Sequence, residues 1–168
     1  GIGYDAITRL AVTTGPGTFT GLRIGLSVAR GLGLSLGVPV VGITSLMALA
    51  AGVKAPRAGE TVHAVVRGRG GQDFFQTFIV QADTAVPAPL TAPRNMDEDE
   101  IRAAIAAMAG RVVGSGAAAD DGHAAQSGVN PVVLALLAAQ LSPVDYPPDP
   151  TYMRAADAVK AKAALPTE

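Results

Sequence analysis

Two histidines and a short acidic stretch have the most obvious catalytic potential in this chain. His63 and His123 are the only histidines, they lie far apart in the sequence, and His63 falls in an expected strand. A metallopeptidase hypothesis therefore lacks a closely spaced set of ligands. The run Asp120-Asp121-Gly122-His123 suggests metal or acid–base chemistry, but in an alanine-rich loop such a run is more often a solvated turn.

A glycine-rich turn at Gly15–Gly17 is the clearest candidate for anion binding. It lies between an expected strand and an expected helix start, where backbone N–H groups could cradle a phosphate. The alternative is a tight turn with no ligand. We favour this alternative because phosphate loops usually add a lysine or a metal-binding acid, and the neighbouring sequence has neither.

Two further groups of charged residues have a structural as well as a functional interpretation. The acidic run Asp97–Glu100 is expected to cap a helix, since the helix dipole favours acidic residues there. The sequence shows no second carboxylate that would pair with this run as a catalytic acid and base. Arg67 and Arg69 lie in a glycine-rich turn, where they either touch RNA or a partner's acidic face or are simply solvated, as is more usual.

The composition excludes several classes of function. The chain has 168 residues, 49% of them apolar, enough for one sizeable domain or two small lobes. A formal net charge of -1 argues against unaided binding of nucleic acid, so any RNA role is expected to be indirect. With no cysteine, thiolate catalysis and cysteine zinc sites are excluded. No apolar run approaches the ~18 residues of a membrane span and no signal peptide pattern is seen, so we expect a cytoplasmic protein without membrane association.

The first part of the chain alternates strands and helices. The expected elements are a strand over 10–13, a helix ending at about Leu36, a strand over 38–43 and a helix over 46–51. Thr18 or Thr20 is expected to cap the first helix, Gly37 to end it, and Thr44 or Ser45 to cap the second. This order predicts an α/β fold with parallel strands.

The rest of the chain follows a short linker over 52–59 and is more varied. The expected elements are hairpin strands over 62–66 and 74–80, a helix over 97–109, a short strand over 112–113 and a helix over 131–141. Residues 117–130 are expected to form a loop, and the proline-rich sequence from Ser142 onward is expected to be irregular.

The first long helix has more apolar surface than one sheet needs. Its polar stripe is narrow and contains Arg23, Ser27 and Arg30, whereas packing on one sheet needs an apolar stripe of only ~100°. We expect two covered sides, the alternative being a helix buried wholly inside its own domain. The side expected to pack on its own sheet contains Ile24, Val28 and Leu32. The side expected to bind a partner contains Leu22, Gly25, Leu26, Ala29 and Gly33.

Small residues recur along this helix. Gly21, Gly25, Ala29 and Gly33 follow one another every four residues, a spacing that lets another backbone approach closely. This pattern supports the assignment of that side to a partner.

The segment over 15–25, GPGTFTGLRIG, closely resembles the GPGSFTGLRIG signature of TsaB proteins, with Thr18 in place of serine. The signature loop in this chain comprises Gly15, Pro16, Gly17, Thr18, Phe19, Thr20, Gly21 and Arg23. The segment over 40–46, VVGITSL, is also similar to that family, and the PTYMR segment over 150–154 is similar to its closing P-x-Y-L-R. The chain departs from the family over 67–73, where relatives usually have a D-A-R-R-x-E-like segment.

The resemblance implies an actin-like fold of two lobes. The first lobe would comprise residues 1–58, incomplete at its N-terminus, with residues 150–168 packing back on it, and the second lobe residues 59–149. Family members begin with a β-hairpin that carries an Asp-x-Ser/Thr motif, and nothing here matches it. The run Gly114-Ser115-Gly116 is similar to an adenosine-side loop of that fold, although a plain turn is the favoured interpretation.

The resemblance also implies a role in bacterial tRNA threonylcarbamoylation. The chain would be a non-catalytic scaffold subunit that binds and stabilises the catalytic subunit TsaD, in a complex with the ATPase TsaE. It would carry no cofactor of its own, with nucleotide binding by the wider complex left open. In this family TsaB pairs with TsaD, or with itself, largely through helices of its first lobe, so the apolar helix is where a partner would bind.

The alternative is an enzyme that acts by itself, either an actin-like nucleotide-dependent transferase or a glycoprotease-like hydrolase. Such an enzyme would need a general base, a metal cluster or a basic phosphate ligand. None of these can be assembled from the sequence patterns above, which favours the scaffold hypothesis.

Overall fold

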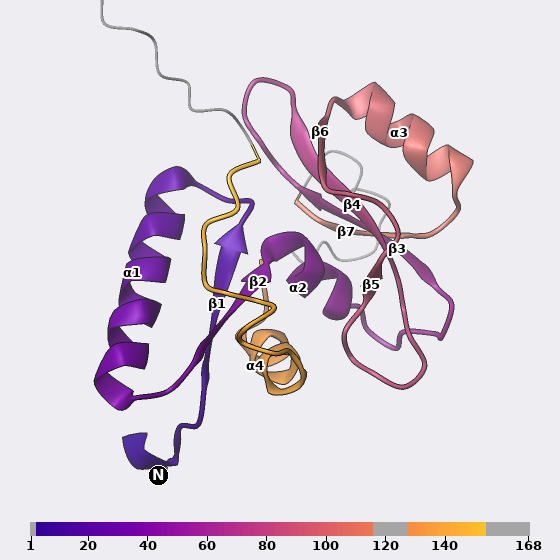
Figure 1. Ribbon diagram of the computed structural model, residues 1–168. Coiled ribbons are helices and arrows are strands. Elements are labelled where there is room, and N and C mark those ends of the chain that lie inside the picture. Colours follow the sequence, from indigo (N-terminus) through magenta and orange to yellow (C-terminus); the bar gives the residue numbers. More distant parts are fainter. Residues whose placement is uncertain (1–2, 116–127, 154–168) are drawn as a thin grey trace, which may run out of the picture.

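The chain forms an α/β structure built on a two-stranded and a five-stranded sheet. The computed structural model describes residues 3–115 and 128–153 (Figure 1). The elements around the smaller sheet are a 3-10 helix (Tyr4–Ala6), β1 (Leu10–Gly15), α1 (Phe19–Leu36), β2 (Val40–Thr44) and α2 (Ser45–Ala51). Strands β1 and β2 pair in parallel, as predicted, from Leu10 with Val40 to Gly15 with Thr44.

The larger sheet follows in the chain. Its elements are β3 (Thr61–Val66), β4 (Asp73–Ile79), β5 (Ala88–Pro89), β6 (Arg94–Met96), α3 (Glu98–Ala107) and β7 (Arg111–Gly114), with α4 (Pro131–Gln140) after them. The strand order is β5-β4-β3-β7, and β6 also pairs with β4. The predicted hairpin of β3 and β4 is confirmed, and β7 pairs with β3 in parallel. Strands β5 and β6 were not predicted from the sequence.

Helix α2 lies between the two sheets, and α1 lies on the opposite side of the smaller one (Figure 1). Residues Leu46 to Ala50 of α2 are all buried. They share one apolar cluster with Val41 and Ile43 of β2, with Phe78 of β4 and with Leu137 of α4. This cluster therefore joins both sheets through α2 and α4.

A second, smaller cluster lies beneath α3. It contains Ile101 of α3, Val65, Phe75, Met96 and Val112. The larger sheet is thus covered by α3 on one face and by α2 on the other.

Local capping fixes the helix boundaries near the predicted positions. The Thr18 hydroxyl accepts a hydrogen bond from the Gly21 amide at 3.3 Å, and the Thr44 hydroxyl accepts one from the Met47 amide at 3.1 Å. Gly37 ends α1 with φ at 65°, a conformation that glycine adopts without strain.

The segment after α4 is irregular, as predicted, and it packs on the smaller sheet. The Gly42 amide donates to the Tyr146 carbonyl at 2.9 Å, and the Thr151 amide donates to the Thr14 carbonyl at 2.8 Å. Residues 154–168 of the tail predicted to pack on the first lobe lie outside the described residues. So does the greater part of the predicted loop over 117–130. The division into a first lobe of residues 1–58 and a second lobe of residues 59–149 stays a prediction. Helix α4 falls within the predicted second lobe, but it packs on β1 and β2.

None of the described helices is both long enough and apolar enough to span a membrane.

Candidate partner-binding surface

The inner side of α1 packs on its own sheet through residues that the sequence assigned to a partner. Leu22 and Leu26 are only 9% and 4% exposed, and Gly33 is also buried. A Cβ atom on Gly33 would lie 2.4 Å from Cγ2 of Val40. Ala29 and Gly25 lie at the margins of this side and are half-buried.

The opposite side of α1 is exposed and apolar. Ile24, Val28 and Leu32 are 61%, 56% and 46% exposed, and they follow one another every four residues along one line of the helix. We call these three residues the outer stripe. Gly21 and Gly31 lie on the same side of the helical wheel, and a Cβ atom on Gly31 would meet no atom within 4 Å.

The face assignment made from the sequence is therefore wrong, because the two apolar sides of α1 are exchanged. The side with Leu22, Leu26, Ala29 and Gly33 meets the sheet because its small residues let the helix approach β2 closely. The outer stripe has Leu32 near the level of Gly33, and a side chain at that level would hold the helix away from Val40. Within the described part of the chain, the side of α1 that stays exposed is that of Ile24, Val28 and Leu32. The helical wheel had shown both sides, but no local signal distinguished them.

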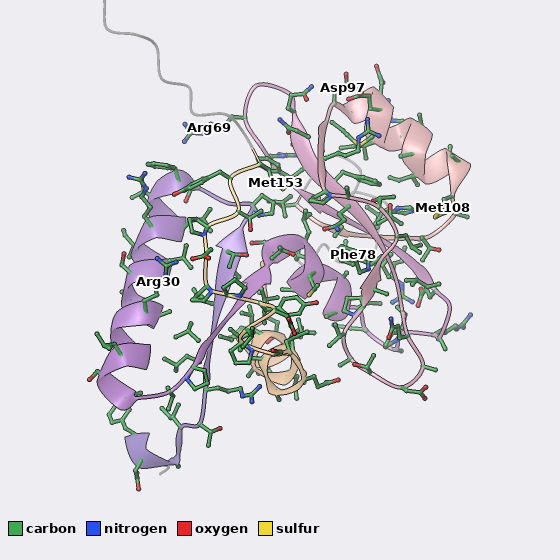
Figure 2. The ribbon with its side chains drawn as sticks, viewed as in Figure 1. Arg30, Arg69, Phe78, Asp97, Met108 and Met153 are labelled. Atoms are coloured by element: carbon green, nitrogen blue, oxygen red, sulfur yellow. The ribbon has the colours of Figure 1, made fainter. Side chains whose placement is uncertain are left out.

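The polar edge of α1 faces the segment over 141–153. Arg30 makes an ion pair with Asp149 at 2.6 Å and donates to the Pro148 carbonyl at 2.6 Å. Figure 2 shows Arg30 on the side of α1 next to this segment. The segment therefore lies against the polar edge of α1, away from the outer stripe.

An aromatic cluster lies at the N-terminal end of α1. The rings of Phe19 and Tyr152 lie 5.9 Å apart, and the Arg23 guanidinium lies 3.7 Å from the centre of the Phe19 ring. Both aromatic residues are about half exposed. This contact joins the signature loop to the P-x-Y segment, a pairing that the sequence did not predict.

The signature loop is packed against that same segment. Gly15 has φ at 118°, and a Cβ atom there would lie 2.9 Å from the Thr151 carbonyl oxygen and 3.3 Å from Leu22. The Gly21 and Leu22 amides, in the first turn of α1, both bond to Thr18. These contacts favour the interpretation of Gly15, Pro16 and Gly17 as a tight strand-to-helix turn, with Thr20 and Arg23 exposed beyond it.

His63 is a core residue. It is 1% exposed, its Nδ1 lies 3.0 Å from the Thr77 hydroxyl, and its Nε2 lies 2.8 Å from the Met108 carbonyl oxygen. The ring also stacks on Phe75, with centroids 5.6 Å apart. Burial lowers the pKa of His63 from its ordinary value of 6.5, against the raising effect of the bond to the Met108 carbonyl. Both ring nitrogens are thus engaged in packing β3 against its neighbours.

The remaining candidate residues have structural roles where they are described. Asp97 and Glu100 form a reciprocal capping box at the start of α3, with both hydrogen bonds at 2.9 Å, as the sequence predicted. Gly114 has φ at 112°, and the Ser115 amide donates to the Val65 carbonyl at 3.0 Å, which makes this a turn at the end of β7. Arg67 and Arg69 are exposed between β3 and β4. Asp120, Asp121, Gly122, His123 and Gly116 lie outside the described residues.

Among residues 3–115 and 128–153, no three acidic or histidine side chains come close enough together to hold a metal ion. Most of the sequence candidates thus resolve into caps, turns and core packing. Among the described residues, the outer stripe remains an exposed apolar surface with no structural role in packing.

Comparison with known proteins identifies relatives of this chain. Residues 1–96 match the family model described as TsaD, tRNA N6-adenosine threonylcarbamoyltransferase. The tRNA threonylcarbamoyladenosine biosynthesis protein TsaB of Escherichia coli (strain K12) is 35% identical over 78 residues, which is 46% of this chain and 34% of that protein. The TsaB protein of Haemophilus influenzae (strain ATCC 51907 / DSM 11121 / KW20 / Rd) is 33% identical over 79 residues, 47% of this chain and 34% of its own length.

A solved structure shares the fold. It is that of an uncharacterized protein from Pseudomonas aeruginosa with similarity to peptidase YEAZ, with a TM-score of 0.72 and 21% identity over 91% of this chain and 76% of that one. The predicted α/β, actin-like fold class is confirmed. The chain spans about a third of the length of the curated relatives it matches. Since the family model covers more than half of it, the chain belongs to the TsaD-type family, as a TsaB-like member.

Proposed function

We propose that this chain takes part in forming threonylcarbamoyladenosine on tRNA, as a non-catalytic subunit that binds and stabilises a TsaD-type catalytic subunit. The observation that carries the proposal is the outer stripe of α1, an apolar surface on the helix that continues from the signature loop. The membership of the TsaD-type family and the names of the curated relatives support a role in forming threonylcarbamoyladenosine.

The energetics of the outer stripe favour a partner. Ile24, Val28 and Leu32 keep about half of their surface in water, although α1 already has a buried side against its own sheet. Full burial of such a side chain stabilises by about 1.5–3 kcal/mol relative to exposure. A contiguous apolar strip of this kind is typical of a protein interface rather than of a solvated helix.

The stripe suits a helix of the partner. Its apolar residues are separated by four positions, the spacing at which one helix packs ridges into the grooves of another. Gly31 lies alongside, where a Cβ atom would meet nothing within 4 Å, and leaves room for close approach.

The described residues support a non-catalytic role. His63 is held by hydrogen bonds at both ring nitrogens, which leaves it no free nitrogen for proton transfer or metal binding. The acidic residues at the start of α3 serve as a cap. Under the proposal, TsaE homologues and tRNA would meet this chain only through the TsaD-type subunit, and any nucleotide would be bound by the assembled complex.

Two matched substitutions test the proposal. Leu32→Glu places a carboxylate on the outer stripe, while Leu34→Glu places the same group two residues away at a side chain that is 87% exposed. An unpaired charge in an apolar interface costs several kcal/mol, and on a free surface it costs little. We therefore expect Leu32→Glu to abolish co-purification with a TsaD homologue and Leu34→Glu to leave it intact, with similar melting temperatures for both.

The result that would refute the proposal is equal retention of the TsaD homologue by the two variants. Calorimetric titration of the purified proteins would give the two affinities directly. Activity of the chain alone on a nucleotide or a peptide would instead favour the independent enzyme.

A further inference from the structure

We draw no further inference here: the strongest candidate, the exposed side-chain cluster of Phe19, Arg23 and Tyr152 at the N-terminal end of α1, carries nothing because its side chains already stack on one another and nothing in the structure shows what covers them.

Discussion

Gly33 of α1 lies so close to Val40 of β2 that a Cβ atom on the glycine would be 2.4 Å from the valine Cγ2. The same atom would be 3.1 Å from the Val38 carbonyl oxygen. Helix α1 can therefore meet its sheet along this line only through a residue without a side chain. This contact determines which side of α1 is left facing outward.

The first prediction compares Gly33→Leu with Gly25→Leu. At Gly33 the added side chain must push α1 away from β2, and overpacking of this kind typically costs about 1–3 kcal/mol or more. At Gly25 a Cβ atom would meet nothing within 4 Å, and the change removes a helix-weakening glycine, which contributes roughly 0.5–1 kcal/mol of stability. Thermal unfolding should show a lower melting temperature for Gly33→Leu and an unchanged or higher one for Gly25→Leu. Equal destabilisation by both would contradict the observed orientation of α1.

The second prediction concerns pH. Burial lowers the pKa of His63 below 6.5 in the folded state, so the unfolded chain binds a proton more readily at this residue. Stability from this group is therefore complete above about pH 6.5 and is lost as the pH falls below that value, until the folded-state pKa is passed. Denaturant unfolding between pH 5.5 and 7.5 should show this slope.

His63→Gln provides the control for the pH prediction. Glutamine keeps a donor and an acceptor but does not titrate, so the slope in this pH range should be smaller in the variant. An identical slope in both proteins would assign the pH dependence to another group.

The parts of the fold that local chemistry determines could be predicted from the sequence. Thr18 and Gly37 bound α1, and Asp97 with Glu100 forms the capping box of α3, because these signals act within a few residues. The parallel pairing of β1 and β2 followed from the alternation of strand and helix.

The parts that depend on distant contacts could not be predicted. Both sides of α1 are apolar, and the choice between them rests on the fit of Gly33 to Val40, which no helical pattern contains. Strand β6, Arg94–Met96, has only three residues and forms because β4 offers it an edge. Helix α4 is apolar all round, so its sequence does not indicate which side packs on β1 and β2.

The third prediction concerns the ion pair of Arg30 and Asp149. Both side chains are largely exposed, and such a pair contributes at most about 1 kcal/mol. Arg30→Ala should therefore change the melting temperature little. It should nevertheless loosen the segment over 141–153. In the unchanged chain the Thr151 amide donates to the Thr14 carbonyl, so we expect faster hydrogen exchange at this amide in the variant.

Asp149→Asn tests whether the ion pair itself holds the segment. If it does, the double variant should exchange no faster at Thr151 than Arg30→Ala alone, since each single change already breaks the pair. Additive effects would mean that the two residues act separately.

The last prediction concerns Arg9, which joins the start of β1 to the end of α4. Its guanidinium donates to the Ala138 and Leu141 carbonyl oxygens, and these groups have few other partners at a helix C-terminus. Arg9→Ala should lower the free energy of unfolding by roughly 1–3 kcal/mol, since it leaves partly buried carbonyls without a charged donor. Arg9→Lys should recover part of this loss, because an ammonium group keeps the charge near the helix end but cannot reach both oxygens with the same fork of donors. Denaturant unfolding of the three proteins gives the order directly: wild type most stable, then Arg9→Lys, then Arg9→Ala. If Arg9→Ala is as stable as the wild type, the end of α4 is held by apolar packing of Leu137 and Leu141 alone, and the guanidinium is dispensable there.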